Sequence, residues 1–225
     1  MHFMAVTARI GRPPGADGEA TRETILKAAL EAFAEAGYEA MSVRALARRL
    51  GVSHNLIHHH FESKRQLWYD AIDFGLGRRA SEIRQFLEIP ESSPRDAIAG
   101  FCEGVRRFIL LGAHLPAIPR ILLHEFAEGG ERLDYIYDQH LQPLVGGAIR
   151  FLGRLGDAKA SDIDARSFIL LIGTSTLSLF NQSAFAEKIG GPDPFSEEAV
   201  ERHIRTVTRT VLTGVLAEPV SDYKR

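Results

Sequence analysis

Two histidines, His54 and His58, stand four residues apart, the spacing at which a helix can present two ligands to one metal ion. No carboxylate or cysteine within the same short segment completes a site, and Glu62 lies just beyond its end. A second candidate, the run from His124 to Glu128, resembles a zinc-hydrolase helix but has Glu where the second His is needed. We therefore expect no metal site, and the two histidines need another explanation.

Nucleophilic catalysis finds equally little support in the sequence. No serine lies in a Gly-x-Ser-x-Gly turn, and no glycine-rich phosphate loop is present. The single cysteine, Cys102, has no recognisable base partner and is expected to be a small buried hydrophobe. We therefore expect a protein that is not an enzyme and carries no cofactor.

The stretch from Ser42 to Lys64 has the pattern of two short helices joined by a turn. Ser42 is the predicted N-cap of a helix that ends before Gly51, and Ser53 is the predicted N-cap of a helix through His60. Gly51 permits a backbone conformation that a side chain would strain. Such a pair is a helix-turn-helix, whose second helix fits the major groove and presents polar groups to base edges.

Apolar residues at helical spacing are expected to hold this unit together and to leave the start of its second helix projecting outward. The same region concentrates positive charge, because residues 41–80 carry seven basic and three acidic side chains although the whole chain has a net charge of −2. A localised basic face is what phosphate binding requires. The expected core residues are Phe33, Leu46, Leu50, Val52, Ile57 and Phe61.

The run SVRALARRLGVSHNLIHHHFESKRQL, with the preceding segment TRETILKAALEAFAEAGYEA, resembles the DNA-binding signature of the TetR/AcrR family of one-component bacterial regulators. The resemblance covers residues 20–70, and the rest of the chain is similar to the family only in length and helical character. It implies a three-helix DNA-binding domain, a fourth helix as a link, and an all-α ligand and dimer domain. The last two helices, near 161–188 and 196–217, would build the four-helix bundle of a homodimer.

The resemblance also assigns roles to single residues. Ser42 and Arg44, which start the positioning helix, would contact phosphate, and Arg44 could also reach a base. Lys64 matches a family lysine that binds phosphate with help from the dipole of the fourth helix. The recognition helix would contribute Ser53, His54, Asn55, Leu56, His58 and His59.

Three of these positions depart from the family pattern. Asn55 replaces a frequent Gly, Leu56 a frequent Thr, and His58 a frequent Tyr that contacts phosphate and a thymine methyl. Asn55 could pair with adenine, whereas Leu56 can give only an apolar contact. In the N-terminal segment, Arg12 either enters an adjacent minor groove or belongs to a solvated tail.

The composition is that of a soluble globular protein, with 225 residues, 45% hydrophobic and 25% charged. Disordered, fibrous and disulfide-rich classes are therefore excluded. The longest nearly apolar run, residues 168–180, is too short and too polar to span a membrane, and the first 20 residues contain no apolar signal region. We expect a cytoplasmic protein with no membrane partner.

Helical periodicity without strand-like alternation predicts an all-α fold of about nine helices. We expect a flexible tail at 1–20, a helix-turn-helix domain at 21–66, and a helical ligand-binding and dimerisation domain at 67–225. The predicted helices span 21–37, 43–50, 53–60, 64–87, 94–113, 117–127, 130–153, 161–188 and 196–217.

Residues of the later helices could line a ligand cavity or form plain core. The apolar and aromatic candidates are Phe101, Val105, Phe108, Leu122, Phe126, Tyr135, Tyr137, Phe168 and Phe180. Polar residues within apolar stretches are costly to bury without partners, so they could orient a ligand or pair within the dimer bundle. These are His114, Glu125, Thr174, Ser175 and Asn181.

The leading hypothesis is a homodimeric, ligand-responsive transcriptional repressor that binds a palindromic operator in double-stranded DNA. A small apolar effector, whose identity the sequence does not give, would release it. One alternative is an all-α small-molecule-binding protein or enzyme with a vestigial DNA-binding head. Another is a nucleoid-type binder, in which phosphate contacts alone give affinity without sequence preference.

Overall fold

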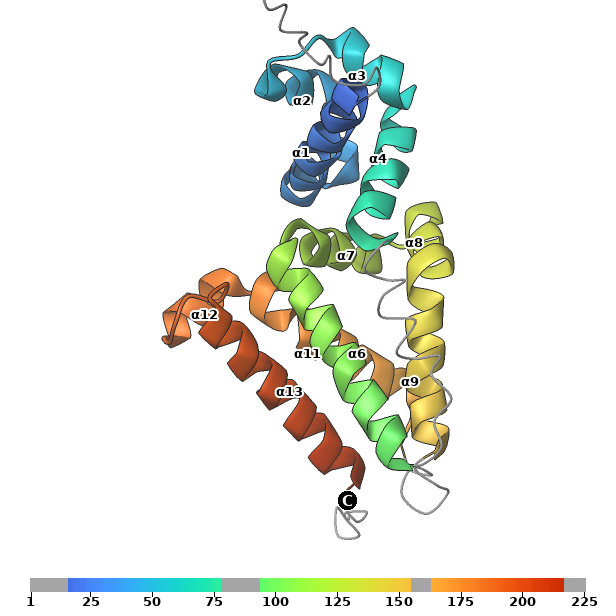
Figure 1. The fold of residues 1–225 in the computed structure, drawn as a ribbon, viewed down its shortest axis with the longest axis vertical. Coiled ribbons are helices and arrows are strands. Elements are labelled where there is room, and N and C mark those ends of the chain that lie inside the picture. Colours follow the sequence, from blue (N-terminus) through green and yellow to red (C-terminus); the bar gives the residue numbers. More distant parts are fainter. Residues whose placement is uncertain (1–15, 78–93, 155–162, 217–225) are drawn as a thin grey trace, which may run out of the picture.

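The computed structural model describes residues 16–77, 94–154 and 163–216, and every regular element in these ranges is a helix. Figure 1 shows a small head at one end of an elongated body. The head contains α1 (Ala16–Ala40), α2 (Val43–Leu50), α3 (His54–Phe61) and α4 (Lys64–Ile72), which continues as the π-helix η1 (Asp73–Gly77). The body contains α6 (Pro94–His114), α7 (Ala117–Glu128), α8 (Glu131–Ile136), the π-helix η2 (Tyr137–Leu141), α9 (Gln142–Arg154), α11 (Ala165–Asn181), α12 (Ser183–Ile189) and α13 (Glu197–Leu216). The prediction of an all-α protein is confirmed.

Side-chain caps begin three helices of the head where the sequence places them. The hydroxyls of Ser42, Ser53 and Ser63 each accept a hydrogen bond from the backbone N–H three residues later. Such a cap satisfies one of the N–H groups that the first turn of a helix leaves without a partner. The predicted starts of α2, α3 and α4 are therefore confirmed.

Three predicted helices differ from the structure. Helix α1 begins at Ala16 rather than Thr21, because Ala16, Glu19 and Ala20 favour a helix and Gly18 is tolerated between them. The helix predicted at 130–153 has nearly the expected ends but contains the π-helix η2. This π-helix ends two residues before Pro143, whose ring would clash with the carbonyl four residues earlier, that of Gln139. The helix predicted at 161–188 breaks at Gln182 into α11 and α12, which are bent by 76°.

Several expectations concern residues outside the described ranges. These are most of the predicted N-terminal tail with Arg12, the part of the predicted fourth helix beyond Gly77, and the segment preceding Pro94. Residues 155–162 and 217–225 also lie outside them.

Two hydrophobic cores organise the described residues. The first core fills the head with the predicted residues Phe33, Leu46, Ile57 and Phe61, and Leu50 and Val52 pack at its edge. It continues through α4 onto the body helix α7. The second core lies between α6, α9, α11 and α13. The head therefore rests on the body through an apolar contact, which fixes where α3 is held.

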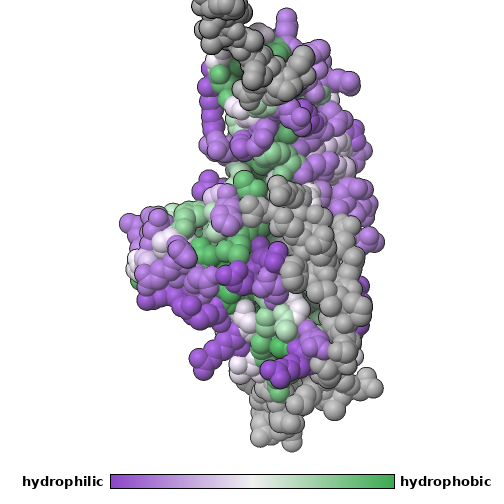
Figure 2. Space-filling view, in the orientation of Figure 1, coloured by the Kyte–Doolittle hydropathy of each residue, from purple (hydrophilic) through white to green (hydrophobic). Residues whose placement is uncertain are grey.

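The surface of the body exposes several large apolar side chains. Leu170 and Leu171 on α11 are 63% and 58% exposed, and Phe185 and Ile189 on α12 are also exposed. In the view of Figure 2, hydrophobic residues come to the surface in the upper body, beside the lobe that carries α12. No single described helix is long and apolar enough to cross a membrane, although α11 and α12 would be if the bent pair is taken together.

Gly112 gives a test of the body core. A Cβ added there would lie 2.6 Å from a ring carbon of Phe180, which is 1% exposed and cannot easily move. We expect Gly112→Ala to lower the free energy of unfolding by about 1–3 kcal/mol through overpacking. The matched control is Gly214→Ala, because a Cβ at Gly214 meets nothing within 4 Å. It should be neutral or stabilise by about 0.5–1 kcal/mol. Urea unfolding of the two variants measures both effects, and equal destabilisation would contradict the packing argument.

Candidate nucleic-acid interface and apolar cavity

The turn between α2 and α3 is made by Gly51 in the left-handed conformation, with φ 67° and ψ 25°. Its N–H donates to the carbonyl of Arg48, and the N–H of Val52 donates to the carbonyl of Ala47. These bonds satisfy the last carbonyls of α2 before α3 starts. A residue with a side chain would be strained at this position, so the glycine explains how tightly the two helices follow one another.

Helix α3 is fixed from one side only. Ile57 and Phe61 are each 1% exposed in the head core, whereas Asn55, His58 and His59 are exposed. His54 and Leu56 are half-buried beside them. The rings of His54 and His58 meet edge-to-face at 6.1 Å. The structure thus brings the predicted residues of the recognition helix together on one outward face.

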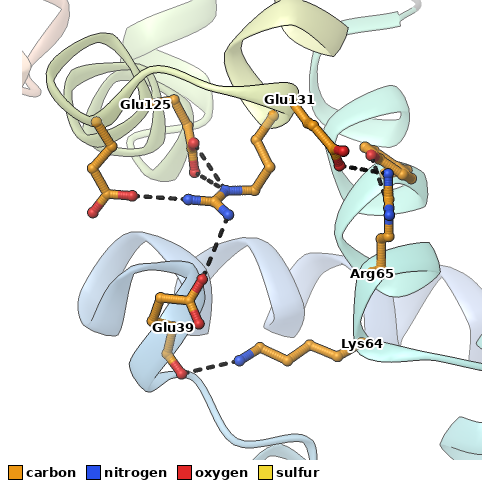
Figure 3. A network of polar contacts seen from close by, with 8 residues as sticks. Glu39, Lys64, Arg65, Glu125 and Glu131 are labelled. Carbon is orange, nitrogen blue, oxygen red and sulfur yellow. Dashed lines mark hydrogen bonds and ion pairs between the residues drawn. The ribbon is translucent and has the colours of Figure 1, made fainter.

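Two of the remaining predicted contacts start α2, and one starts α4. Ser42 and Arg44 are exposed at the first turn of α2. Lys64 is half-buried at the start of α4, where its Nζ donates to the backbone carbonyl of Glu39 at 3.0 Å (Figure 3). The same Nζ lies 4.7 Å from the centre of the Tyr38 ring. In this conformation, Lys64 therefore has partners inside the protein.

A second feature is a cavity of about 330 Å³ in the body, lined by α6, α7, η2, α9 and α11. Its lining is almost wholly apolar, with Tyr137, Thr174 and Thr176 as the polar side chains; the hydroxyl of Thr176 donates to carbonyls of its own helix. A mostly apolar cavity of this size suits a small organic molecule. Six of the residues proposed for a ligand site line it: Phe101, Val105, Phe108, Phe126, Tyr137 and Thr174.

The other proposed ligand residues lie elsewhere. Leu122 and Tyr135 pack in the first core, and Phe168 and Phe180 in the second. His114 is exposed at the end of α6. Ser175 and Asn181 are half-buried on α11, where the side-chain oxygen of Asn181 is buried without a hydrogen-bond partner. Glu125 is buried in an ion pair with Arg132.

The Arg132 ion pair belongs to a polar network that sequence reasoning missed. Its Nε donates to both carboxylate oxygens of Glu125, at 3.0 and 2.9 Å, and its Nη2 to Glu128 at 2.8 Å. Across the junction with the head, Nη1 lies 3.7 Å from Glu39, and the guanidinium lies 4.3 Å from the centre of the Tyr38 ring. Figure 3 shows the ion pairs with Glu39 and Glu125 between the ends of α1, α7 and α8. The sequence carries no signal for the contacts with Tyr38 and Glu39, because these residues lie more than 90 positions from Arg132.

A second polar link joins η1 to α8 and η2. Asp73 accepts hydrogen bonds from the Tyr135 hydroxyl at 2.9 Å, and its Oδ1 lies 2.8 Å from Nε2 of the buried His140. Burial alone would raise the pKa of Asp73, but the hydrogen bonds with His140 and Tyr135 lower it below its ordinary value. Desolvation and the nearby Asp73 carboxylate raise the pKa of Tyr135, so this hydroxyl stays protonated as a donor. Within the described residues, no group of three or more His, Cys, Asp or Glu is placed to hold a metal ion.

The head of the molecule is similar in sequence to known proteins. Residues 25–68 match the family model described as bacterial regulatory proteins, tetR family. Over 63 residues, the chain is 41% identical to the HTH-type transcriptional repressor Rv1474c of Mycobacterium tuberculosis (strain ATCC 25618 / H37Rv). That match spans 28% of this chain and 31% of the relative, so it covers less than a third of the relative's length.

Solved structures share the fold over most of the chain. A HlyIIR mutant protein superposes with a TM-score of 0.68 at 21% identity, covering 90% of this chain and 99% of its own. The ketosteroid transcriptional regulator KstR2 of Mycobacterium tuberculosis gives 0.65 at 18% identity, with coverages of 84% and 94%. FadR from Bacillus subtilis, solved in complex with stearoyl-CoA, gives 0.60 at 14% identity, with coverages of 87% and 99%. These TM-scores show that the chain shares its fold with the three structures.

The hydrogen bonds of Asp73 with Tyr135 and His140 lead to a prediction of how the free energy of unfolding depends on pH. Because folding lowers the pKa of Asp73, its carboxylate stabilises the native state at pH values above its ordinary pKa of 3.8, and this contribution is lost as pH falls through the lower native value. We expect Asp73→Asn to lower stability at pH 7 and to flatten the fall in stability below about pH 4. Urea unfolding between pH 3 and 7 tests this, with Asp138→Asn, on the exposed side of η2, as the control. A parallel acid dependence in native protein and Asp73→Asn would show that Asp73 does not contribute.

Proposed function

Because residues 25–68 match the family model of bacterial regulatory proteins, tetR family, we propose that this protein is a homodimeric transcriptional repressor. It binds a palindromic operator in double-stranded DNA and is released by a small apolar effector. The observation that carries the proposal is helix α3, fixed in the head core by Ile57 and Phe61 while its polar residues point outward. A helix held in this way can enter the major groove as a rigid body.

The DNA contacts are divided between phosphates and bases. Ser42, Arg44 and Lys64 contact the backbone from the starts of α2 and α4, and His58 and His59 extend these contacts along α3. Asn55 reads a base edge, and Ser53, His54 and Leu56 lie beside it at the start of the recognition helix. In this scheme the DNA-binding domain spans residues 21–66, and residues 67–225 form the effector and dimer domain.

Dimerisation gives the operator its symmetry. We place the dimer interface on α11–α12 and α13, and the exposed Leu170, Leu171, Phe185 and Ile189 of α11 and α12 support this placement. Two recognition helices of such a dimer read half-sites one helical turn apart when they are separated by about 34–36 Å. Analytical ultracentrifugation of the native chain and of Leu171→Glu tests the interface.

The effector binds in the apolar cavity between α6, α7, α9 and α11. Its apolar lining and its volume of about 330 Å³ support a ligand that is mainly hydrocarbon. The solved complex of Bacillus subtilis FadR with stearoyl-CoA gives a ligand with an apolar chain in a protein of the same fold. Binding needs only to prefer the head spacing that does not fit the operator, since about 3 kcal/mol of differential affinity shifts occupancy over a hundredfold.

Selection from a random duplex DNA library at near-physiological salt is the main test. Enrichment of a palindrome supports a sequence-reading dimer and supplies the operator for effector titrations. If the folded, dimeric protein enriches no sequence, α3 does not act as a reader under these conditions. Equal affinity for selected and random DNA would instead favour binding through phosphates alone.

Lys64 provides a prediction for the phosphate contacts. We expect Lys64→Ala to weaken binding to operator and random DNA by similar factors and to lower the slope of log K against log salt by about one unit, because one counterion-releasing contact is lost. Arg95→Ala, at the exposed start of α6 and outside the proposed dimer interface, is the matched control. A loss confined to the operator would contradict the assignment of Lys64 to a phosphate.

Asn55 provides the corresponding prediction for base reading. We expect Asn55→Ala to lose discrimination at one base pair of each half-site, at a cost of about 1–3 kcal/mol, while the salt slope stays unchanged. Affinities for a set of single-base operator variants measure this. If native protein and Asn55→Ala rank the variants identically, Asn55 does not read a base.

A further inference from the structure

We propose that Arg132 is a positioning residue that ties the orientation of the head to the occupancy of the apolar cavity. The inference rests on the proposed function and identifies the physical link between its two sites. Arg132 begins this link because its side chain contacts both parts of the molecule: Glu125 and Glu128 of α7 in the body, and Tyr38 and Glu39 of α1 in the head.

The body side of the link has little freedom. Glu125 is 2% exposed, and both of its carboxylate oxygens accept hydrogen bonds from Nε of Arg132. Burial raises the pKa of Glu125, and the bonds from Arg132 oppose this shift by favouring the charged form. A buried carboxylate without its partner is strongly unfavourable, so Arg132 must follow Glu125 whenever α7 moves.

The cavity touches the same two helical segments. Phe126, the residue after Glu125, and Tyr137, at the end of α8, both line the cavity and are 48% and 40% exposed. Between α7 and α8 the chain passes through Gly129 and Gly130, which have φ values of 71° and 81°. A side chain would be strained at both positions, and the two glycines form a joint about which α8 can change its angle to α7. A ligand that displaces Phe126 or Tyr137 therefore acts on both ends of the Glu125–Arg132 pair.

The head side of the link ends at a proposed DNA contact. The guanidinium of Arg132 and the ammonium of Lys64 both lie within cation–π distance of the Tyr38 ring, at 4.3 and 4.7 Å. Lys64 also donates to the backbone carbonyl of Glu39, whose carboxylate faces Arg132 (Figure 3). A shift of Arg132 therefore changes the surroundings of the residue that starts α4 and faces phosphate in the proposed complex.

A second ion pair between head and body, Arg65 with Glu131, is less suited to this role. Its side chains are 60% and 77% exposed, and such exposed pairs contribute little. Neither residue lines the cavity. Arg132 combines a buried partner, the neighbourhood of the cavity and a contact with the head.

The test fills the cavity by mutation, so that no effector has to be known. Gly173 lines the cavity, and a Cβ there meets nothing within 4 Å, so Gly173→Leu adds apolar atoms to the cavity wall. Gly153→Leu, on α9 and outside the proposed dimer interface, is the matched control because its Cβ also meets nothing within 4 Å and it does not line the cavity. Each is combined with Arg132→Gln and, as a second control, with Glu131→Gln, which removes the exposed ion pair with Arg65.

Two readouts separate this proposal from the proposed function. The first is affinity for the selected operator. The second needs no DNA: it is the fluorescence of Trp68, the single tryptophan, which is 1% exposed and lies edge-on to Tyr38 and Tyr135. We expect Gly173→Leu to weaken operator binding by about fivefold or more and to shift the Trp68 emission, and we expect Arg132→Gln to abolish both effects. Gly153→Leu should change neither readout, and Glu131→Gln should leave both effects of Gly173→Leu in place.

The proposal is overturned if Gly173→Leu and Arg132→Gln have additive effects on the Trp68 emission. If Gly173→Leu shifts the Trp68 emission by the same amount in the native chain and in Arg132→Gln, the coupling does not pass through Arg132. If it shifts the emission in neither, the cavity is not coupled to the head. Should Arg132→Gln lack a cooperative unfolding transition, Tyr38→Leu and Glu39→Gln decide, because both remove head contacts and leave the Glu125–Arg132 pair intact. If no variant binds DNA, the proposed function fails, while the Trp68 readout still tests the link.

Discussion

The apolar contact of α7 with the head is the constraint on which the rest of the structure depends. Ile118, Ile121 and Leu122 of α7 belong to the same buried core as the anchors of α3, so the head cannot separate from α7 without disturbing its own packing. The same helix carries Phe126 at the cavity. A close-packed interior transmits displacement rather than absorbing it, so events in the cavity and at the DNA-binding surface share one rigid element.

The polar contacts around this apolar junction set the orientation of the head. Hydrophobic burial is non-directional and would tolerate small rotations of the head on α7. The ion pair of Arg132 with Glu39 and the hydrogen bond from Tyr135 to Asp73 join defined atoms across this junction, and they select one orientation from those that the apolar contact allows. The two π-helices, η1 and η2, contribute Asp73 and His140 to this second set of contacts. Irregular turns of this kind often occur at functional positions in helical proteins.

Much of the head could be predicted from the sequence because its determinants are local. The serine caps, the glycine at the α2–α3 turn and the periodic apolar residues all act within a few positions, and the structure confirms the elements that they predict. The cavity could be predicted only in part. Phe101 and Phe126 line it while Phe168 and Phe180 fill core, and an aromatic residue at helical spacing is compatible with both. The contact of Arg132 with the head could not be predicted, since Tyr38 and Glu39 lie more than 90 positions away in the chain.

The surroundings of Lys64 show that the proposed phosphate contact requires little change in the head. Its ammonium group has a carbonyl and an aromatic ring as partners, and neither is an anion. A DNA phosphate would be a stronger partner, because it adds the attraction between two opposite full charges to the hydrogen bond. Operator binding therefore needs only a modest rearrangement of Lys64 around Tyr38, and the same ring is in contact with Arg132. The contacts that orient the head and the contact that would engage the DNA thus converge on one aromatic side chain.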